Sequence, residues 1–254
     1  MPRTLGVRAR FTAVVVGIVA LLAGCGLGNP TPTVAPRAGH HEVLLLGDSV
    51  LGNTASVLPN VLAAHGLDAT IDDAHVNGSG LASNAGFGST PLDYLKAQLS
   101  AHPGVDTVVF AWTDSCAECP VAYGSQQFYD LWTANAHALI DYLKATPRPG
   151  GGSYSIVWVE NPPMPPGPPG TFYEISPAVA QVLNWHSVAD YAPRAGGSAD
   201  FWRALSDTSL QYQEFLQYDG ALHQVRADDK VHLTVDGATR TSTWLAAGLA
   251  DVWN

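Results

Sequence analysis

Three short, uninterrupted hydrophobic segments constrain the fold of this 254-residue chain more than any other feature. They run from Val43 to Gly47, from Thr107 to Trp112 and from Tyr154 to Val159. Continuous apolar runs of this length are typical of strands buried on both faces, as in parallel sheets. Because helical patterns lie between them, the sequence predicts an α/β protein with a central parallel sheet and helices on both faces.

The intervening segments supply the expected helices and two further strands. We expect helices at residues 50–64, 91–101, 126–145 and 239–252 and one that begins at 177–183. Pro59 would kink or restart the first of them, and Pro91 suits the first position of the second. A weaker strand is expected at 69–76 and a last strand at 201–205. The proline-rich residues 161–170 can form neither a helix nor the interior of a sheet.

The first 25 residues predict an export signal and not a part of the fold. Three arginines and no acidic residue precede an apolar segment over residues 11–24. That length suits the hydrophobic region of a signal peptide and is short for a membrane span. The segment ends in Leu-Ala-Gly before Cys25, which resembles the lipobox of bacterial lipoproteins, whose cysteine is lipidated and becomes the new N-terminus. Ordinary secretion with cleavage nearby and an uncleaved anchor helix are the alternatives.

The chain is therefore expected to comprise a signal peptide (1–24), lipidated Cys25 with a flexible Gly/Pro/Thr-rich tether (25–40) and one domain (41–254). Loss of the three leader arginines would change the formal net charge from −10 to −13. So acidic a chain lacks the positive surface that nucleic acids or anionic lipids require. We expect no nucleic-acid partner and a membrane attachment that depends on lipid at Cys25.

No nucleotide or metal site is expected. The chain has neither a Walker-type phosphate loop nor a G-x-G-x-x-G motif, and the glycine-rich residues 77–88 lack that spacing. The adjacent His40 and His41 could suggest a metal site, but such a pair at the end of a linker is more often only solvated. We therefore expect a protein without a cofactor.

The first residues with distinctive chemistry follow the first predicted strand, at Gly47, Asp48 and Ser49. In open α/β sheets ligands bind at the carboxyl ends of the strands, so this junction is a candidate site. Glycine permits a sharp turn, and a serine at a helix start lies beside free N–H groups that favour a developing anion. Such a serine becomes a nucleophile when a base takes its proton. The alternative is that Asp48 or Ser49 only caps the helix.

A second group lies near the other end of the chain, where Asp229 and His232 stand three residues apart. One turn can bring such a pair together, so that the carboxylate holds one ring nitrogen while the other faces the serine. An exposed polar loop is the alternative. Because the members of a catalytic triad are neighbours in space and not in sequence, the long separation from Ser49 is compatible with a shared site.

A block at Asn77–Gly80 and a predicted strand ending in Ala111–Asp114 accompany these two motifs. In order and spacing, over residues 43–254, the four blocks resemble the SGNH/GDSL hydrolases. The stretch 201–234 is similar to the SGNH domains of bacterial envelope glycan-acylation proteins. The resemblance implies a flavodoxin-like, three-layer α/β/α sandwich with a central parallel sheet, the SGNH hydrolase fold, and it implies ester chemistry.

The resemblance also implies the roles of the catalytic residues. Ser49 corresponds to the nucleophile, His232 to the general base and Asp229 to the residue that orients the histidine. Asp228 would replace Asp229 only if the register of the loop shifted. Asp48 is expected to support the site.

The oxyanion hole would use the backbone N–H of Ser49 and that of Gly80, with Gly78 as the alternative. The third block departs from the family pattern Gly-x-Asn-Asp, because Thr113 stands where an asparagine normally donates to the oxyanion. A hydroxyl can also donate, with shorter reach. Loss of one such donor costs roughly 2.7–4 kcal/mol in the barrier. Either Thr113 substitutes, another donor does, or activity is modest; Asp114 is expected to support the site.

Two further features border the predicted site. Cys116 and Cys119 are expected to form a small disulfide loop, as suits an exported protein, and a zinc half-site or a redox pair is the alternative. Trp112 lies beside the predicted site and could stack on a sugar face, as could Trp185. For tryptophans in apolar patterns, core packing is the alternative.

Together these observations predict an exported serine esterase that hydrolyses O-acyl esters, for example acetyl esters, on a cell-envelope glycan or glycolipid. It would be lipid-anchored to the outer face of the bacterial cytoplasmic membrane or lie in the cell envelope. The alternatives are an acyltransferase that moves an acyl group to a glycan hydroxyl and a catalytically decayed, glycan-binding lipoprotein.

Overall fold

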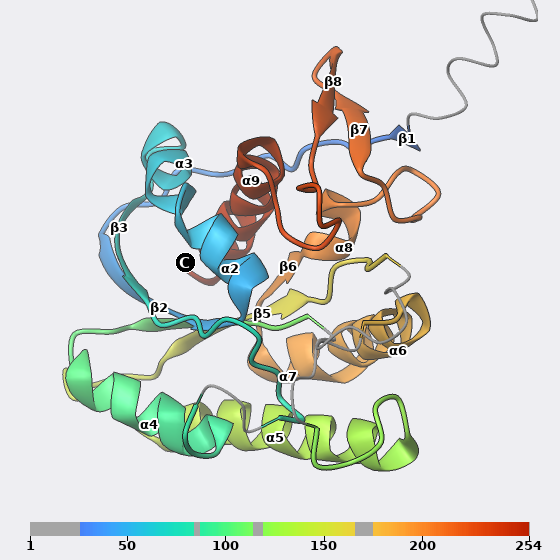
Figure 1. The fold of residues 1–254 in the computed structure, drawn as a ribbon. Coiled ribbons are helices and arrows are strands. Elements are labelled where there is room, and N and C mark those ends of the chain that lie inside the picture. The colour runs from blue at the N-terminus through green and yellow to red at the C-terminus, as the bar shows by residue number, and fades with distance from the viewer. Residues whose placement is uncertain (1–25, 84–86, 114–118, 166–174, 254) are drawn as a thin grey trace, which may run out of the picture.

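Five parallel strands form the central sheet of the computed structural model, which describes residues 26–83, 87–113, 119–165 and 175–253 (Figure 1). The strands are β2 (His40–Gly47), β3 (Asp68–Asp73), β4 (Thr107–Ala111), β5 (Ser155–Glu160) and β6 (Ser198–Asp200). Their order is β3-β2-β4-β5-β6, and each pairing is parallel. This is the flavodoxin-like strand order. The order reverses between β2, the first strand of this sheet in the chain, and β4.

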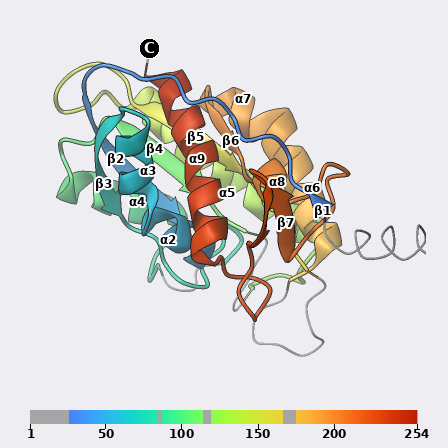
Figure 2. The same ribbon diagram turned by 90° about the horizontal axis from the view of Figure 1, so that it is seen from above.

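Helices cover both faces of this sheet (Figures 1 and 2). One face carries α2 (Ser49–Ala55), α3 (Leu58–Ala64) and α9 (Val235–Val252). The other carries α4 (Pro91–Ala101), α5 (Gln126–Ala145), α6 (Pro177–His186), the π-helix η1 (Ser187–Tyr191) and α7 (Ala192–Ala195). The predicted three-layer α/β/α sandwich is therefore confirmed.

Alternating side chains of the strands fill two separate cores. Leu44 and Phe110 pack with α4 and α5, whereas Val43 and Val109 pack with α2, α3 and α9. All four side chains are fully buried. Complete burial of one such side chain contributes about 1.5–3 kcal/mol, so these strands hold the sheet between its two helical layers.

Most predicted elements are confirmed, several with boundaries that differ by a few residues, and one is of another type. The helices at 91–101 and 126–145 have the predicted limits, and the first helix ends at Ala55 and restarts as α3 at Leu58, with Pro59 in its first turn. The prediction of a last strand at 201–205 is wrong: β6 ends at Asp200, and residues Phe201–Ala204 form the short helix α8. Asp200 caps this helix by accepting a hydrogen bond from the Arg203 N–H, which favours a helix start over an extended strand.

A second, three-stranded sheet was not predicted. It contains β1 (Gly26–Leu27), β7 (Phe215–Tyr218) and β8 (Ala221–Gln224) in the order β1-β7-β8. The hairpin β7–β8 is antiparallel, and β1 adds to β7 in parallel. This small sheet lies beside the main one in Figure 1 and leads into the loop before α9.

Residues 28–39, expected to form a flexible tether, lie along the domain instead. The amide of Asn29 donates to the main-chain oxygens of Arg203 and Asp207, and Val34 is buried in the core beneath α3 and α9. Arg37 donates to the Ala250 carbonyl oxygen at 2.7 Å. Side-chain hydrogen bonds, which composition does not reveal, thus hold this polar segment in place. Among the described residues, no helix is long and apolar enough to cross a membrane.

Candidate active site

A sharp turn at the carboxyl end of β2 places Ser49 at the start of α2. A side chain at Gly47 would bring its Cβ within 1.8 Å of the Ala111 carbonyl oxygen, so only glycine fits between β2 and β4. Asp48 caps the helix, since its Oδ1 accepts a hydrogen bond from the Val50 N–H at 3.0 Å. The close strand packing and the cap together fix the serine at the edge of the sheet where ligands bind.

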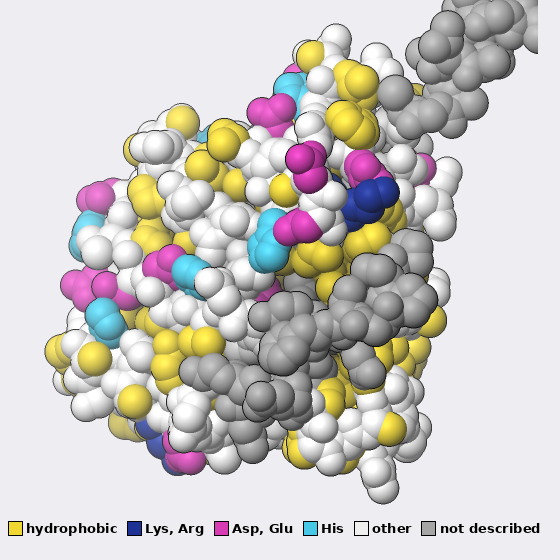
Figure 3. All heavy atoms as spheres, viewed as in Figure 1, with side chains coloured by type: hydrophobic (Ala, Val, Ile, Leu, Met, Phe, Trp, Pro, Cys, Tyr) yellow, Lys and Arg dark blue, Asp and Glu magenta, His cyan; other side chains and the backbone are white. Residues whose placement is uncertain are grey.

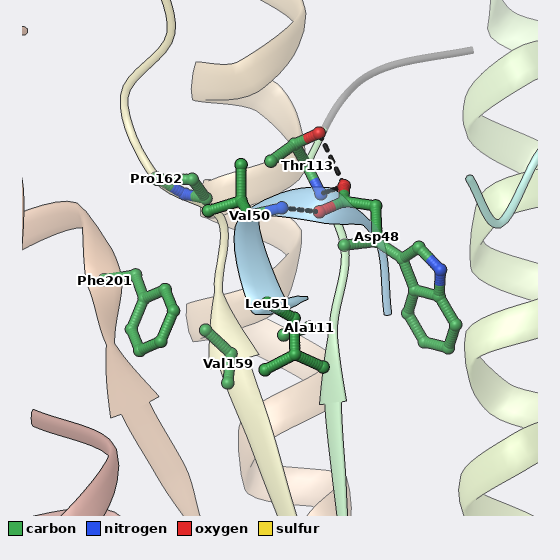
Figure 4. A pocket seen from close by; sticks show the side chains of 9 residues that line it. Asp48, Val50, Leu51, Ala111, Thr113, Val159, Pro162 and Phe201 are labelled. Atoms are coloured by element: carbon green, nitrogen blue, oxygen red, sulfur yellow. Dashed lines mark hydrogen bonds between the residues drawn. The ribbon is translucent and has the colours of Figure 1, made fainter. Parts of the chain in front are cut away.

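The carboxylate of Asp48 is buried and holds the end of β4 against this turn. Its Oδ2 accepts hydrogen bonds from the Thr113 N–H at 2.6 Å and from the Thr113 hydroxyl at 2.7 Å (Figure 4). Burial raises the pKa of Asp48, against the opposing effect of the hydrogen bonds from Thr113, Val50 and Leu51. Asp48 therefore joins two strand ends and the helix start through one buried group.

Beneath Asp48, side chains from three strand ends and the first turn of α2 line a small hollow. It is mostly apolar, with Leu51, Val159 and Phe201 among the lining side chains (Figure 4). Asp48 and Thr113 supply its polar atoms. The low polarity of these surroundings is the physical reason why burial governs the pKa of Asp48.

The loop between β8 and α9 brings His232 and Asp229 to Ser49. His232 Nε2 lies 2.8 Å from Ser49 Oγ, and His232 Nδ1 lies 2.5 Å from Asp229 Oδ2. Because a carboxylate only accepts hydrogen bonds, Nδ1 carries the proton and Nε2 accepts from the serine hydroxyl. The structure thus brings together the three residues, 183 positions apart at most, that the sequence singled out.

The Asp229 carboxylate is organised by its own loop. Its Oδ1 accepts hydrogen bonds from the N–H groups of Val231 at 3.0 Å and His232 at 2.9 Å. Burial alone would raise the pKa of Asp229, but these bonds and that of the His232 side chain outweigh it and lower the pKa. The carboxylate is therefore ionised at neutral pH and able to stabilise a protonated His232.

Packing and one side-chain hydrogen bond attach this loop to α2, the helix that begins at Ser49. Val50, the residue after Ser49, and Leu233, the residue after His232, belong to the same buried cluster. Asn53 Oδ1 accepts a hydrogen bond from the Leu233 N–H at 3.0 Å. On the face drawn in Figure 3, histidine and acidic side chains lie side by side near the position of this loop.

The block at Asn77–Gly80 lies next to the end of β2. The Ser79 hydroxyl donates to the Gly47 carbonyl oxygen at 3.2 Å and accepts from the Trp112 indole N–H at 3.2 Å. Gly78 has a φ of +71°, and Gly80 is buried. The Ser49 N–H belongs to the first turn of α2, where N–H groups have no partner within the helix. The predicted backbone donors of an oxyanion hole are thus carried by adjoining segments.

Two predicted roles differ from what the structure shows. Both donors of Thr113, its N–H and its hydroxyl, bind Asp48, so the hydroxyl proton is not directed at the space beside Ser49. The expectation that Thr113 donates to the oxyanion is therefore not supported. Trp112 is 4% exposed and packs against Phe110 and Trp158, so it supports the site from the core and offers no face to a sugar. Trp185 remains 64% exposed on α6.

Several predicted residues lie outside the described part of the chain. Asp114, Cys116 and Cys25 are among them, so the support by Asp114, the disulfide of Cys116 with Cys119 and the lipidation of Cys25 stay predictions. Asp228 is exposed, and the His232 ring contacts Asp229. Within the described ranges, no group of three or more His, Cys, Asp or Glu side chains is arranged to hold a metal ion.

Sequence reasoning missed three residues that hold the loop carrying Asp229 and His232. The Asn53 side chain accepts a hydrogen bond from the Leu233 N–H, where the loop ends. The Tyr212 hydroxyl donates to the Lys230 carbonyl oxygen at 2.8 Å, and Arg226 lies fully buried beneath the loop. Each is a single polar residue without a motif around it. No pattern in the sequence could have indicated them, because their partners are main-chain oxygens or N–H groups elsewhere.

The geometry can be compared with known proteins. Residues 42–247 match the family model described as "Protein of unknown function (DUF459)". No curated protein matches the chain.

Solved structures of low sequence identity share the fold. A GDSL-like lipase from Bacteroides thetaiotaomicron has a TM-score of 0.52 at 16% identity, over 80% of this chain and 85% of its own. An M. smegmatis aryl esterase has a TM-score of 0.54 at 14% identity, over 84% of this chain and 99% of its own. For a carbohydrate acetylesterase family member from Sinorhizobium meliloti the TM-score is 0.51 at 19% identity, over 84% of this chain and 96% of its own. These similarities confirm the SGNH/GDSL hydrolase fold.

Proposed function

This chain belongs to the family described as protein of unknown function (DUF459), and we propose that it is a serine esterase. The observation that carries the proposal is the continuous hydrogen-bonded chain from Ser49 through His232 to Asp229. Nucleophile, base and orienting carboxylate at these distances form the arrangement that activates a serine hydroxyl. The SGNH/GDSL fold of the chain is consistent with this chemistry.

The reaction proceeds in two halves. Ser49 Oγ attacks the acyl carbonyl carbon while His232 Nε2 takes its proton, and Asp229 stabilises the resulting imidazolium. Backbone N–H groups of Ser49 and the Gly80 block stabilise the oxyanion, with Gly78 as the alternative donor. The alcohol departs with the proton from His232 and leaves an acyl-serine. Water, deprotonated by His232, then attacks this ester and releases a carboxylic acid.

We propose an O-acyl ester of a cell-envelope glycan or glycolipid as the substrate. The sequence supports this through its predicted export signal and the lipobox that ends in Cys25. Among the structures that share the fold is one described as a carbohydrate acetylesterase family member, and an acetyl ester on a carbohydrate is one form of the proposed substrate. The enzyme would work at the outer face of the cytoplasmic membrane or in the cell envelope.

Labelling with a fluorophosphonate probe tests the proposed nucleophile. Wild-type protein should form a covalent adduct, and Ser49→Ala should form none. Ser56→Ala is a matched control, because Ser56 follows α2 and is exposed on the surface. A folded wild type that stays unlabelled would refute the esterase and favour a glycan-binding protein. Product analysis with an acyl donor and a glycan acceptor distinguishes release of free acid from acyl transfer.

A further inference from the structure

Arg226 is a fully buried charged side chain at the base of the loop that carries the proposed acid–base pair. It pairs with Leu233 in an antiparallel bridge, so the two residues close the loop on either side of Asp229 and His232. The Ala227 N–H adds a hydrogen bond of 2.9 Å to the His232 carbonyl oxygen. The main chain therefore closes the loop at Arg226 and Leu233, and the Arg226 side chain extends from this point.

The guanidinium group joins two loops that meet at the site. Its Nη1 donates to the Val231 carbonyl oxygen at 2.5 Å, and its Nη2 donates to the Pro163 carbonyl oxygen at 2.7 Å. Val231 lies between Asp229 and His232 in the chain, and Pro163 lies in the loop after β5. A planar guanidinium holds two acceptors at fixed directions, which a flexible ammonium cannot do.

The segment that Arg226 holds is conformationally strained. Lys230, next to Val231, has a φ of +66°, in the left-handed region that non-glycine residues rarely adopt. The Tyr212 hydroxyl donates to the Lys230 carbonyl oxygen, and the Tyr212 ring lies 5.6 Å from Arg226 Cζ. Such a conformation persists only where its surroundings hold it, and Arg226 and Tyr212 supply two of those contacts.

Burying the charged guanidinium of Arg226 costs free energy of desolvation, so good packing alone does not account for an arginine at this position. Burial lowers the pKa of Arg226 to about 10, against the opposing effects of Tyr212, Asp229 and Asp48, so the group is charged at neutral pH. Its Nε is buried without a hydrogen-bond partner among the described residues. An apolar side chain of similar volume would avoid this cost, so the two carbonyl contacts are what the cation adds.

We propose that Arg226 is a positioning residue, which holds His232 and Asp229 in register with Ser49 by fixing the Val231 carbonyl oxygen to the loop at Pro163. This role rests on the proposed esterase function, because it acts through the same three residues. The guanidinium itself does not touch the substrate.

Arg240 offers a matched control elsewhere in the same fold. It is 3% exposed, its Nε donates to the Ala204 carbonyl oxygen at 2.6 Å, and its Nη2 donates to the Asn29 carbonyl oxygen. Its Cζ lies 4.3 Å from the Tyr218 ring. Both arginines are thus buried cations over tyrosines that bind main-chain oxygens, but Arg240 holds the N-terminal segment and not the triad loop.

The experiment compares Arg226→Lys, Arg226→Met and Arg240→Met in the full chain. The rate of fluorophosphonate labelling reports the activation of Ser49, and the melting temperature reports stability. We expect both methionine variants to lower the melting temperature. Only the Arg226 variants should slow labelling, by about 10- to 100-fold for methionine and less for lysine, which keeps the charge and its donors but lacks the planar fork that fixes two acceptors. If Arg226→Met does not fold, Arg226→Lys carries the comparison.

A spectroscopic measurement separates this role from the esterase proposal. The proton between His232 Nδ1 and Asp229 Oδ2 should give a far-downfield NMR resonance in wild type and in Arg240→Met, broadened or lost in the Arg226 variants. If wild type does not label, the esterase proposal fails while this resonance still tests the loop. Wild-type labelling rates and an unchanged resonance in folded Arg226→Lys and Arg226→Met would overturn the positioning role.

Discussion

The two halves of the candidate site are built in opposite ways. Asp48, beside Ser49, is 1% exposed, follows β2, and accepts hydrogen bonds from Thr113 after β4 and from Val50 in α2. The side chains of His232 and Asp229 are 42% and 53% exposed and lie on a loop that follows the small second sheet. One half is therefore part of the hydrophobic core, and the other lies at the surface and is held mainly by hydrogen bonds, within its own loop and to Asn53 and Pro163.

This difference separates what each half contributes. A buried carboxylate affects both stability and catalysis, because its charge must be compensated for the protein to fold. An exposed ion pair contributes at most about 1 kcal/mol to stability, so we expect the geometry of the Asp229–His232 pair to matter for chemistry more than for stability. The pKa shifts reflect the same contrast, since burial raises the pKa of Asp48 whereas hydrogen bonds lower that of Asp229. Substitutions can test each part of this contrast.

The largest effect is expected for Asp229→Asn, on activity alone. The amide oxygen can still accept from the Val231 and His232 N–H groups, so the loop should keep its shape. The amide NH₂ would face His232 Nδ1 and force the proton onto Nε2, where it can no longer accept from Ser49. We expect a loss of about 10³- to 10⁴-fold in kcat on an aryl acetate, with the melting temperature nearly unchanged.

Asp236→Asn is the control for this prediction. Asp236 forms a similar pair with His223, at 3.0 Å, on the neighbouring end of α9. It is not bonded to Ser49, so its variant should keep wild-type kcat. Equal losses for the two variants would show that the effect is general to such pairs, and a large fall in melting temperature for Asp229→Asn would contradict the separation of roles.

The strand ends of the main sheet, where the buried half lies, should instead show their burial in the pH dependence of stability. Burial and the neighbouring Asp200 raise the pKa of Glu160 from 4.5 to about 7, and the two residues pair in register at the ends of β5 and β6. Because the folded pKa is raised, the stabilising contribution is complete below about pH 4.5 and is lost as pH rises through about 7. Asp229, with a lowered pKa, has the opposite sign.

Urea unfolding at pH 5 and pH 8.5 measures this contribution. Between these values the free energy of unfolding should fall on the order of 2–3 kcal/mol through Glu160, and Glu160→Gln should remove that part of the fall. The variant should then be more stable than wild type at pH 8.5. An unchanged pH profile in Glu160→Gln would show that the carboxyl ends of the strands are more hydrated than their burial indicates.

The same contrast explains what the sequence could predict. The Gly47–Ser49 turn was predictable because a hydrophobic strand, a glycine and a helix pattern follow one another locally. The second sheet was not, since β1, β7 and β8 are too short to carry an alternating pattern. Arg226 and the segment after Gly26 depend on main-chain oxygens from distant parts of the chain. Thr113 was located correctly, but only the fold shows that its hydroxyl binds Asp48.

Thr113→Val is expected to have the smallest effect and decides how the buried half acts. Valine keeps the volume and the N–H donor but removes the hydroxyl bond to Asp48, which should cost about 1–2 kcal/mol of stability. Labelling of Ser49 and kcat should change less than about threefold, because the hydroxyl proton points to Asp48 and not to an oxyanion. Thr54→Val, which removes a buried hydroxyl bond within α2, is the control for stability.

A fall of about 10²- to 10³-fold in kcat with Thr113→Val would instead identify this residue as an oxyanion donor. Since Thr113 would then have to release Asp48 during turnover, that result would also end the contrast between a fixed, buried half and a solvent-exposed, chemical half.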